Sequence, residues 1–103
     1  MILTGKAKED FLKWNEDNDA PLSTYAIEQG LIYGTVLNSI IIEWFDSVGI
    51  YIEIILIHGD EKAFTFEFSY KDYFNYCDKE FSSRGEAVGR AIVNVNEIYN
   101  IQQ

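Results

Sequence analysis

The feature that most constrains the fold of this chain is the sequence IYIEIILIHGDEKAFTFEFSY, which predicts a β-hairpin with two unlike arms. The second arm, 63–69, alternates phenylalanine with small or polar residues, the pattern of a strand with one buried face. The first arm, 50–57, is apolar on both faces. Its second face holds Tyr51, Glu53, Ile55 and Ile57. We expect this face to be covered either by the aromatic segment 70–81 or by a second copy of the chain in a homodimer.

Helical periodicity is found on both sides of the hairpin. Apolar residues spaced by three and four predict helices over 5–16, 31–46 and 84–100. A short helical turn is expected within 21–30, and a short third strand near 72–77. This order of elements predicts an α+β fold, a small two-layer sandwich with N-terminal helices, an antiparallel two- to three-stranded meander and a C-terminal helix. A chain of 103 residues is expected to form a single domain, 1–103.

Helix ends are predicted by capping residues. Thr4 is the expected N-cap of the first helix. Ser83 and Glu86 have the spacing of a capping box at the start of the last helix. Glu86 is also four residues from Arg90, so the two side chains are expected to pair on the helix surface.

The composition excludes several kinds of partner. Seventeen acidic and eight basic residues give a net charge of −9, which disfavours direct binding to nucleic acid and to anionic membranes. The longest apolar run, SIIIEWF, is too short to span a bilayer. The first residues lack a signal-peptide core, and the single cysteine cannot form an intrachain disulfide, so we expect a cytoplasmic protein.

The residues capable of catalysis are few. His58, next to Asp60 and Glu61, could act as a general base or metal ligand, but a solvated hairpin tip explains it better. Cys77 lacks the surroundings of a nucleophile and is expected to be a structural, at least partly buried cysteine. We therefore expect no enzyme activity, no catalytic residue, no metal site and no cofactor.

A second set of residues is considered for ligand binding. Arg84 lies at a helix N-terminus, where backbone N–H groups can receive an anion, and Arg90 lies nearby. Trp44, Tyr73 and Tyr76 could supply stacking surfaces, although Trp44 is also well placed for the core. A homo-oligomeric sponge would sequester a nucleotide-type defence signal in pockets between its subunits, with Tyr or Trp stacking beside Arg84 or Arg90.

Three segments, LTGKAKEDFLKW, IIEWFDSVGIYI and SSRGEAVGRAIVNVNEIYN, together resemble a group of small uncharacterised proteins from phages and prophages of Bacteroidota-type bacteria. The resemblance covers about half of the chain and consists of helix stripes, a cap and a helix-to-strand turn. It implies a small accessory gene of a mobile element. Such genes often encode inhibitors, so the main hypothesis is an acidic protein that binds and inhibits a host or defence protein. The sponge is the alternative hypothesis, and a hydrolase that uses His58 is the third.

Overall fold

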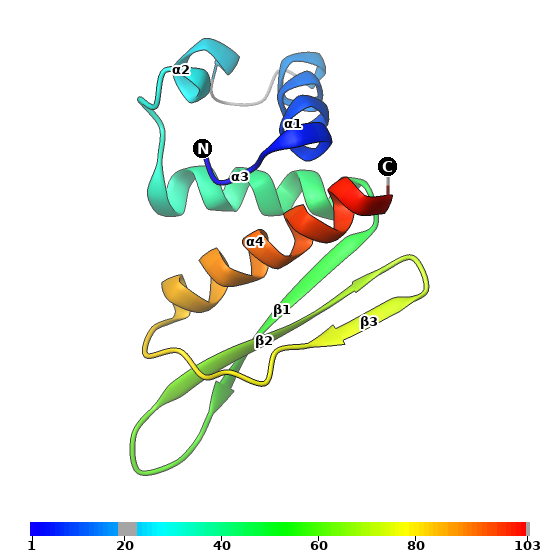
Figure 1. Ribbon diagram of the computed structural model, residues 1–103. Helices are drawn as coiled ribbons and strands as arrows, with labels where there is room; N and C mark the ends of the chain where they lie inside the picture. The colour runs from blue at the N-terminus through cyan, green and yellow to red at the C-terminus, as the bar shows by residue number, and fades with distance from the viewer. Residues whose placement is uncertain (19–22, 103) are drawn as a thin grey trace.

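The computed structural model describes residues 1–18 and 23–102. Within these ranges the chain is α+β, as predicted, with helices on both sides of an antiparallel meander in the sequence (Figure 1). The elements are α1 (Gly5–Asp17), α2 (Thr24–Glu28), α3 (Gly34–Ser47), β1 (Ile50–Ile57), β2 (Ala63–Tyr70), β3 (Tyr73–Tyr76) and α4 (Arg84–Gln102). The predicted break between the first two helices, at residues 19–22, lies outside the described residues.

The sheet has the strand order β1-β2-β3, with both neighbouring pairs antiparallel. Ile50 is opposite Tyr70 and Ile54 is opposite Phe66, so the even-numbered residues of both arms of the hairpin share one face. We call this the inner face, because Phe66 and Phe68 are buried under the helices. The alternating pattern of the second arm therefore predicts its buried face correctly.

The helices all lie on the inner side of the sheet (Figure 1). α4 packs across β2 and β1, and α3 contacts both β1 and α4. α1 packs on α3 and α4, on the side away from the sheet, and α2 lies beside it. The helical part of the sandwich is thus two helices deep, which gives a chain of this size a continuous apolar core.

Trp44 lies at the centre of that core and is 1 % exposed. Its ring centroid is 5.8 Å from that of Phe11 on α1 and 5.2 Å from that of Tyr99 on α4. A third ring, Phe45, is 5.2 Å away. Aromatic side chains from three helices meet at this residue, so the function of Trp44 is to join the helices to one another.

The N-terminus of α1 is capped by α4. Thr4 occupies the N-cap position, as predicted, but its side chain makes no capping bond to its own helix. The Thr4 hydroxyl accepts a hydrogen bond from Asn96, and the Asn100 side-chain oxygen accepts one from the backbone N–H of Ala7 at 2.8 Å. The side chain of Asn100 is within 3.3 Å of the position that a Cβ on Gly5 would occupy, where the backbone φ is +58°. Two asparagines far away in sequence thus supply the cap.

The helix predicted over 31–46 begins later than expected, and that prediction is corrected here. Tyr33 is extended, and Gly34 has a φ of +61°, so the first helical turn starts at Gly34. Leu31 is outside the helix and mostly exposed. A positive φ at Gly49 then turns the chain from the end of α3 into β1.

The capping box of α4 forms in a shifted way. The Ser83 hydroxyl accepts a hydrogen bond from the N–H of Glu86, as predicted. The Glu86 carboxylate accepts from the backbone and hydroxyl of Ser82, one residue before the cap. The predicted ion pair between Glu86 and Arg90 does not form. Among the described residues, the two side chains whose charged atoms lie within 4.0 Å are Lys6 and Asp10. No described helix is long and apolar enough to cross a membrane.

Candidate functional site

The face of the sheet turned away from the helices carries the candidate site, and we call it the outer face. Its residues follow from the strand register. One row across the sheet is Tyr51, Ser69 and Phe74, and the next is Glu53, Glu67 and Tyr76. The predicted interface residues Tyr51, Glu53, Ile55 and Ile57 all lie on this face, as alternation along β1 requires.

Three aromatic side chains of the outer face are exposed to solvent in the described chain. Tyr51 is 58 % exposed, Phe74 is 55 % exposed and Tyr76 is 71 % exposed. The rings of Phe74 and Tyr76 contact each other edge to face, with their centroids 4.8 Å apart. Large aromatic side chains gathered on one exposed surface are typical of interaction sites.

The segment that follows β2 extends the sheet and leaves part of its outer face uncovered. β3 pairs with β2, and Cys77 continues this pairing through a backbone hydrogen bond to Phe66. Phe81 then returns to pair with Phe64, and the Thr65 hydroxyl donates to the Cys77 carbonyl between them. Segment 70–81 therefore does not cover the second face of β1 at Tyr51 and Glu53, which stay exposed, because its backbone prolongs the sheet beyond β2. Ile55 and Ile57 on the same face are half-buried. A second copy of the chain stays a prediction for that face.

Two carboxylates lie side by side in the middle of the outer face. Glu53 and Glu67 are directly opposite each other on β1 and β2. Loss of solvent around Glu67, a hydrogen bond with Glu53 and repulsion from its charge raise the pKa of Glu67 above its usual value. Like charges directly opposite each other destabilise a pair of strands, so the stability of the fold does not explain why Glu53 and Glu67 are both acidic.

A small hollow adjoins the two carboxylates, with a volume of about 130 Å³. Ser69 forms its floor, because this small side chain lies between the large side chains of Tyr51 and Phe74 in its row. Glu53 and Glu67 form one end of the hollow. The hollow thus has two aromatic walls and a negative end.

The arginines predicted to bind a ligand do not form one site within the chain. The Arg84 guanidinium lies over the ring of Phe64, 5.2 Å from its centroid, beside a hollow of about 200 Å³ between α3 and α4. Arg90 lines a different hollow, of about 500 Å³, with Phe81 and Ile2. A spacing of six residues places the two side chains on different sides of α4.

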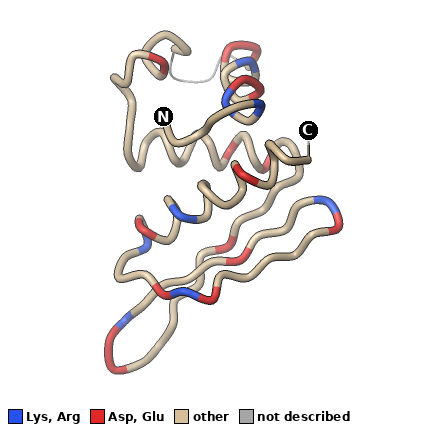
Figure 2. The backbone as a smooth tube through the Cα atoms, in the orientation of Figure 1, with Lys and Arg blue, Asp and Glu red and all other residues tan. Residues whose placement is uncertain are grey.

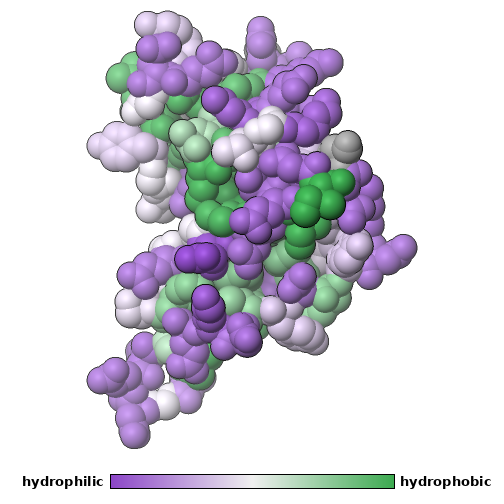
Figure 3. All heavy atoms as spheres, viewed as in Figure 1, coloured by the Kyte–Doolittle hydropathy of each residue, from purple (hydrophilic) through white to green (hydrophobic). Residues whose placement is uncertain are grey.

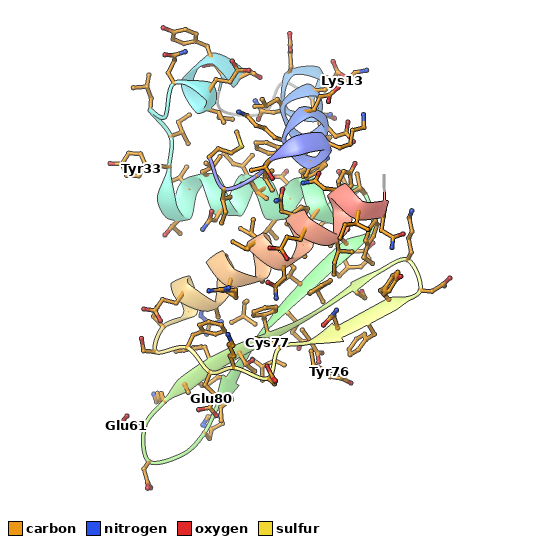
Figure 4. All side chains as sticks on the ribbon, in the orientation of Figure 1. Lys13, Tyr33, Glu61, Tyr76, Cys77 and Glu80 are labelled. Carbon is orange, nitrogen blue, oxygen red and sulfur yellow. The ribbon has the colours of Figure 1, made fainter. Side chains whose placement is uncertain are left out.

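The predicted aromatic ligand-binding residues are also dispersed. Trp44 is buried in the core, so its prediction as a binding residue is corrected. Tyr73 is exposed, but it is opposite Tyr70 and therefore projects on the inner side of the sheet. Among the residues predicted to bind a ligand, Tyr76 lies on the outer face, opposite Glu67. Figure 4 shows it below β3.

The residues considered for catalysis lie apart from this face. His58 is exposed at the hairpin tip, which is hydrophilic in the space-filling view (Figure 3). Cys77 is a half-buried free cysteine, as predicted. Within the described chain, no three histidine, cysteine or acidic residues are grouped closely enough to hold a metal ion.

A second group of polar side chains joins α1 to α4 at the edge of the core. Tyr99 donates a hydrogen bond of 2.6 Å to Asp10, which also pairs with Lys6 at 2.9 Å. Burial and the hydrogen bond to Asp10 raise the pKa of Tyr99 well above its usual range. Burial acts to raise the pKa of Asp10, but the hydrogen bonds from Tyr99 and Lys6 outweigh it and lower that pKa. This group stabilises the helix packing.

The remaining charges are distributed over several elements of the described structure. Figure 2 shows acidic residues on α1, on the sheet, at the hairpin tip and along the segment before α4, with basic residues between several of them.

Comparisons of this chain with protein-family models, curated proteins and solved structures gave no match. The functional argument therefore depends on the outer face itself. Sequence reasoning identified Tyr51, Glu53 and Tyr76 but not Glu67 or Phe74. Pairing the two arms of the hairpin about the loop HGDEK would have placed Glu67 opposite Glu53, and the alternation of β3 would have placed Phe74 beside Tyr76.

Proposed function

We propose that the protein acts by binding another protein through the outer face of its sheet. Its target would be a host or defence protein in the cytoplasm of the bacterial host, which it would inhibit as an accessory protein of a phage or mobile element. The observation that carries this proposal is the exposure of Tyr51, Phe74 and Tyr76 on a rigid sheet whose other face is packed with helices. The resemblance noted in the sequence supports the genomic setting.

Binding without catalysis agrees with where the reactive side chains lie. His58 is at the hairpin tip, while Cys77 pairs with the edge of β2. An active site needs its nucleophile or base next to other functional groups, in a place that can exclude water. The outer face offers instead a broad surface with exposed aromatic residues, which are the residue types that dominate protein interfaces.

The sponge function has no comparable support. Within the chain, the predicted stacking residues do not lie beside the arginines. Trp44 is buried, and neither Tyr73 nor Tyr76 lines the hollow beside Arg84 or the one beside Arg90. We therefore place the contact on the outer face and not at the start of α4.

The test compares two variants in affinity capture from lysates of Bacteroidota-type bacteria, the hosts that the resemblance implies. The double variant Y51S/F74S removes two exposed rings from the outer face. Tyr33→Ser removes a ring that is 77 % exposed and stands out from the start of α3, far from the sheet (Figure 4). Both variants alter exposed side chains, so both should stay folded, which circular dichroism checks.

We expect the wild type and Tyr33→Ser to retain the same specific protein, and Y51S/F74S to lose at least about tenfold in affinity for it, since each anchor contributes about 1 kcal/mol or more. The purified target should lose its activity when the wild-type protein is added. Capture that survives Y51S/F74S would refute the assignment of the contact to the outer face. Turnover of a small substrate, abolished by one substitution, would refute binding as the function.

A further inference from the structure

We infer that the partner inserts an arginine side chain into the hollow of the outer face, with its guanidinium group at Glu53 and Glu67. This inference rests on the proposed function and specifies the chemistry of the target. The arginine stem would lie over Ser69, between Tyr51 and Phe74, and the charged group would reach the negative end of the hollow.

Charge is the first reason. Glu53 and Glu67 face each other across the strands with no basic side chain in an ion pair with either one among the described residues. Such a like-charge pair has an unfavourable interaction in the free protein, and a cation between the carboxylates converts it into a favourable one. Loss of solvent is the largest cause of the raised pKa of Glu67, and the hydrogen bond with Glu53 and repulsion from its charge add to it. A cation bound between the carboxylates would counteract the repulsion and act to lower that pKa.

The aromatic walls are the second reason and favour arginine over lysine. A guanidinium group is planar, stacks on aromatic rings and donates two parallel hydrogen bonds to a carboxylate, whereas an ammonium group is a compact and strongly hydrated charge. Tyr51 and Phe74 provide the rings beside the hollow. Cation–π contacts with these rings would add to the attraction of the carboxylates.

The size of the hollow is the third reason. At about 130 Å³, it is well below the roughly 300–1,000 Å³ of pockets that enclose small-molecule ligands. A side chain presented by a larger partner fits this space, and the exposed rings around it can then contact the partner's surrounding surface. The occupant is thus part of a macromolecule and not a free metabolite.

Overall charge then selects a basic protein. Each copy of this chain carries −9, and two outer faces stacked on each other would bring together four carboxylates, from Glu53 and Glu67 of both copies. Nucleic acid is repelled for the same reason. A protein with a positively charged surface is attracted over a distance, and the arginine fixes its position at contact.

The first experiment uses a short probe and requires no knowledge of the target. The isotope-labelled protein is titrated at low salt with the peptide acetyl-Leu-Arg-Leu-amide, while NMR records the amides of β1–β3 and the carboxyl carbons of Glu53 and Glu67. The control peptide replaces arginine by citrulline, which keeps the size and most of the donors but removes the charge. A third peptide contains lysine.

We expect the arginine peptide to shift the Glu53, Glu67 and Ser69 signals and to lower the pKa of Glu67. The citrulline peptide should bind about tenfold more weakly, corresponding to about 1.4 kcal/mol. The double variant E53Q/E67Q should remove the difference between the peptides, while Glu97→Gln, at an exposed position of α4, should leave it unchanged. The inference would be overturned if the arginine and citrulline peptides gave equal shifts, or if the lysine peptide bound more strongly than the arginine peptide. It would also be overturned if the Tyr51 and Phe74 signals shifted with protein concentration in the absence of peptide, because this would indicate a second copy on the outer face.

The captured target separates this inference from the proposed function. If E53Q/E67Q and Y51S/F74S both lose the target, both proposals hold. If only Y51S/F74S loses it, and the affinity of the wild type does not fall as salt is raised, the outer face binds protein but the arginine contact is wrong.

Discussion

Asn100→Ala tests whether α4 holds the start of α1 in place. The Asn100 side chain accepts a hydrogen bond from the N–H of Ala7 at 2.8 Å and donates one to the carbonyl of Thr4 at 2.9 Å. Each such bond contributes about 1 kcal/mol, so their loss costs about 2 kcal/mol. Alanine is the better helix former by up to about 0.7 kcal/mol, which leaves a net loss of about 1.5 kcal/mol in the free energy of unfolding.

The assay is urea unfolding followed by circular dichroism and tryptophan fluorescence. Asn94→Ala on the same helix is the matched control, because it makes the same change of side chain at a position with no side-chain hydrogen bond among those found. The melting temperature of Asn100→Ala should fall by roughly 6–12 °C, at about 4–8 °C per kcal/mol. If the two variants differ by less than about 0.5 kcal/mol, the cap supplied by α4 is not a stabilising feature and the reasoning fails.

Three further predictions concern the core and the two polar groups. Trp44→Ala should lower the free energy of unfolding by about 3–5 kcal/mol, measured by urea unfolding, because it leaves a cavity where three helices meet. Glu67→Gln should stabilise the protein at pH 7. Because the pKa of Glu67 is raised in the folded state, its contribution to wild-type stability is full below the unfolded pKa and is lost as pH rises through the folded pKa. The variant should lose less stability over this range, and thermal melting that shows the same pH dependence for both proteins would contradict this. Asp10→Asn should have the opposite effect. The lowered pKa of Asp10 stabilises the wild type above the unfolded pKa, and this stabilisation is lost as pH falls through the folded pKa. The variant should therefore be less stable than the wild type at pH 7 and lose less stability in acid, as measured by thermal melting.

Local pattern was enough to predict the elements of the fold. The spacing of Ala87, Ala91 and Val95 identified the buried stripe of α4, and all three are fully buried. The alternation of phenylalanine in β2 identified its inner face. The start of α3 was predicted wrongly because apolar residues continue before Gly34, and a positive φ is not visible in a hydrophobic pattern.

The candidate site could be predicted only in part. The face of β1 that carries Tyr51 and Glu53 follows from the period of a strand. Within the ligand-binding set, Trp44 was predicted wrongly, because its chemistry does not show which side of α3 faces the core. Binding by Arg84 and Arg90 stays a prediction. The pairing of Glu53 with Glu67 needed the strand register, which combines two segments.

Neighbours along the chain were enough to predict the class of fold, the Ser83 cap of α4 and the buried face of β2. The tertiary structure alone decided that Asn100 caps α1, that Trp44 joins three helices, and that segment 70–81 extends the sheet and leaves part of its outer face open. These depend on contacts between residues far apart in sequence. Their positions are set by how the helices and sheet pack together, which periodicity does not encode.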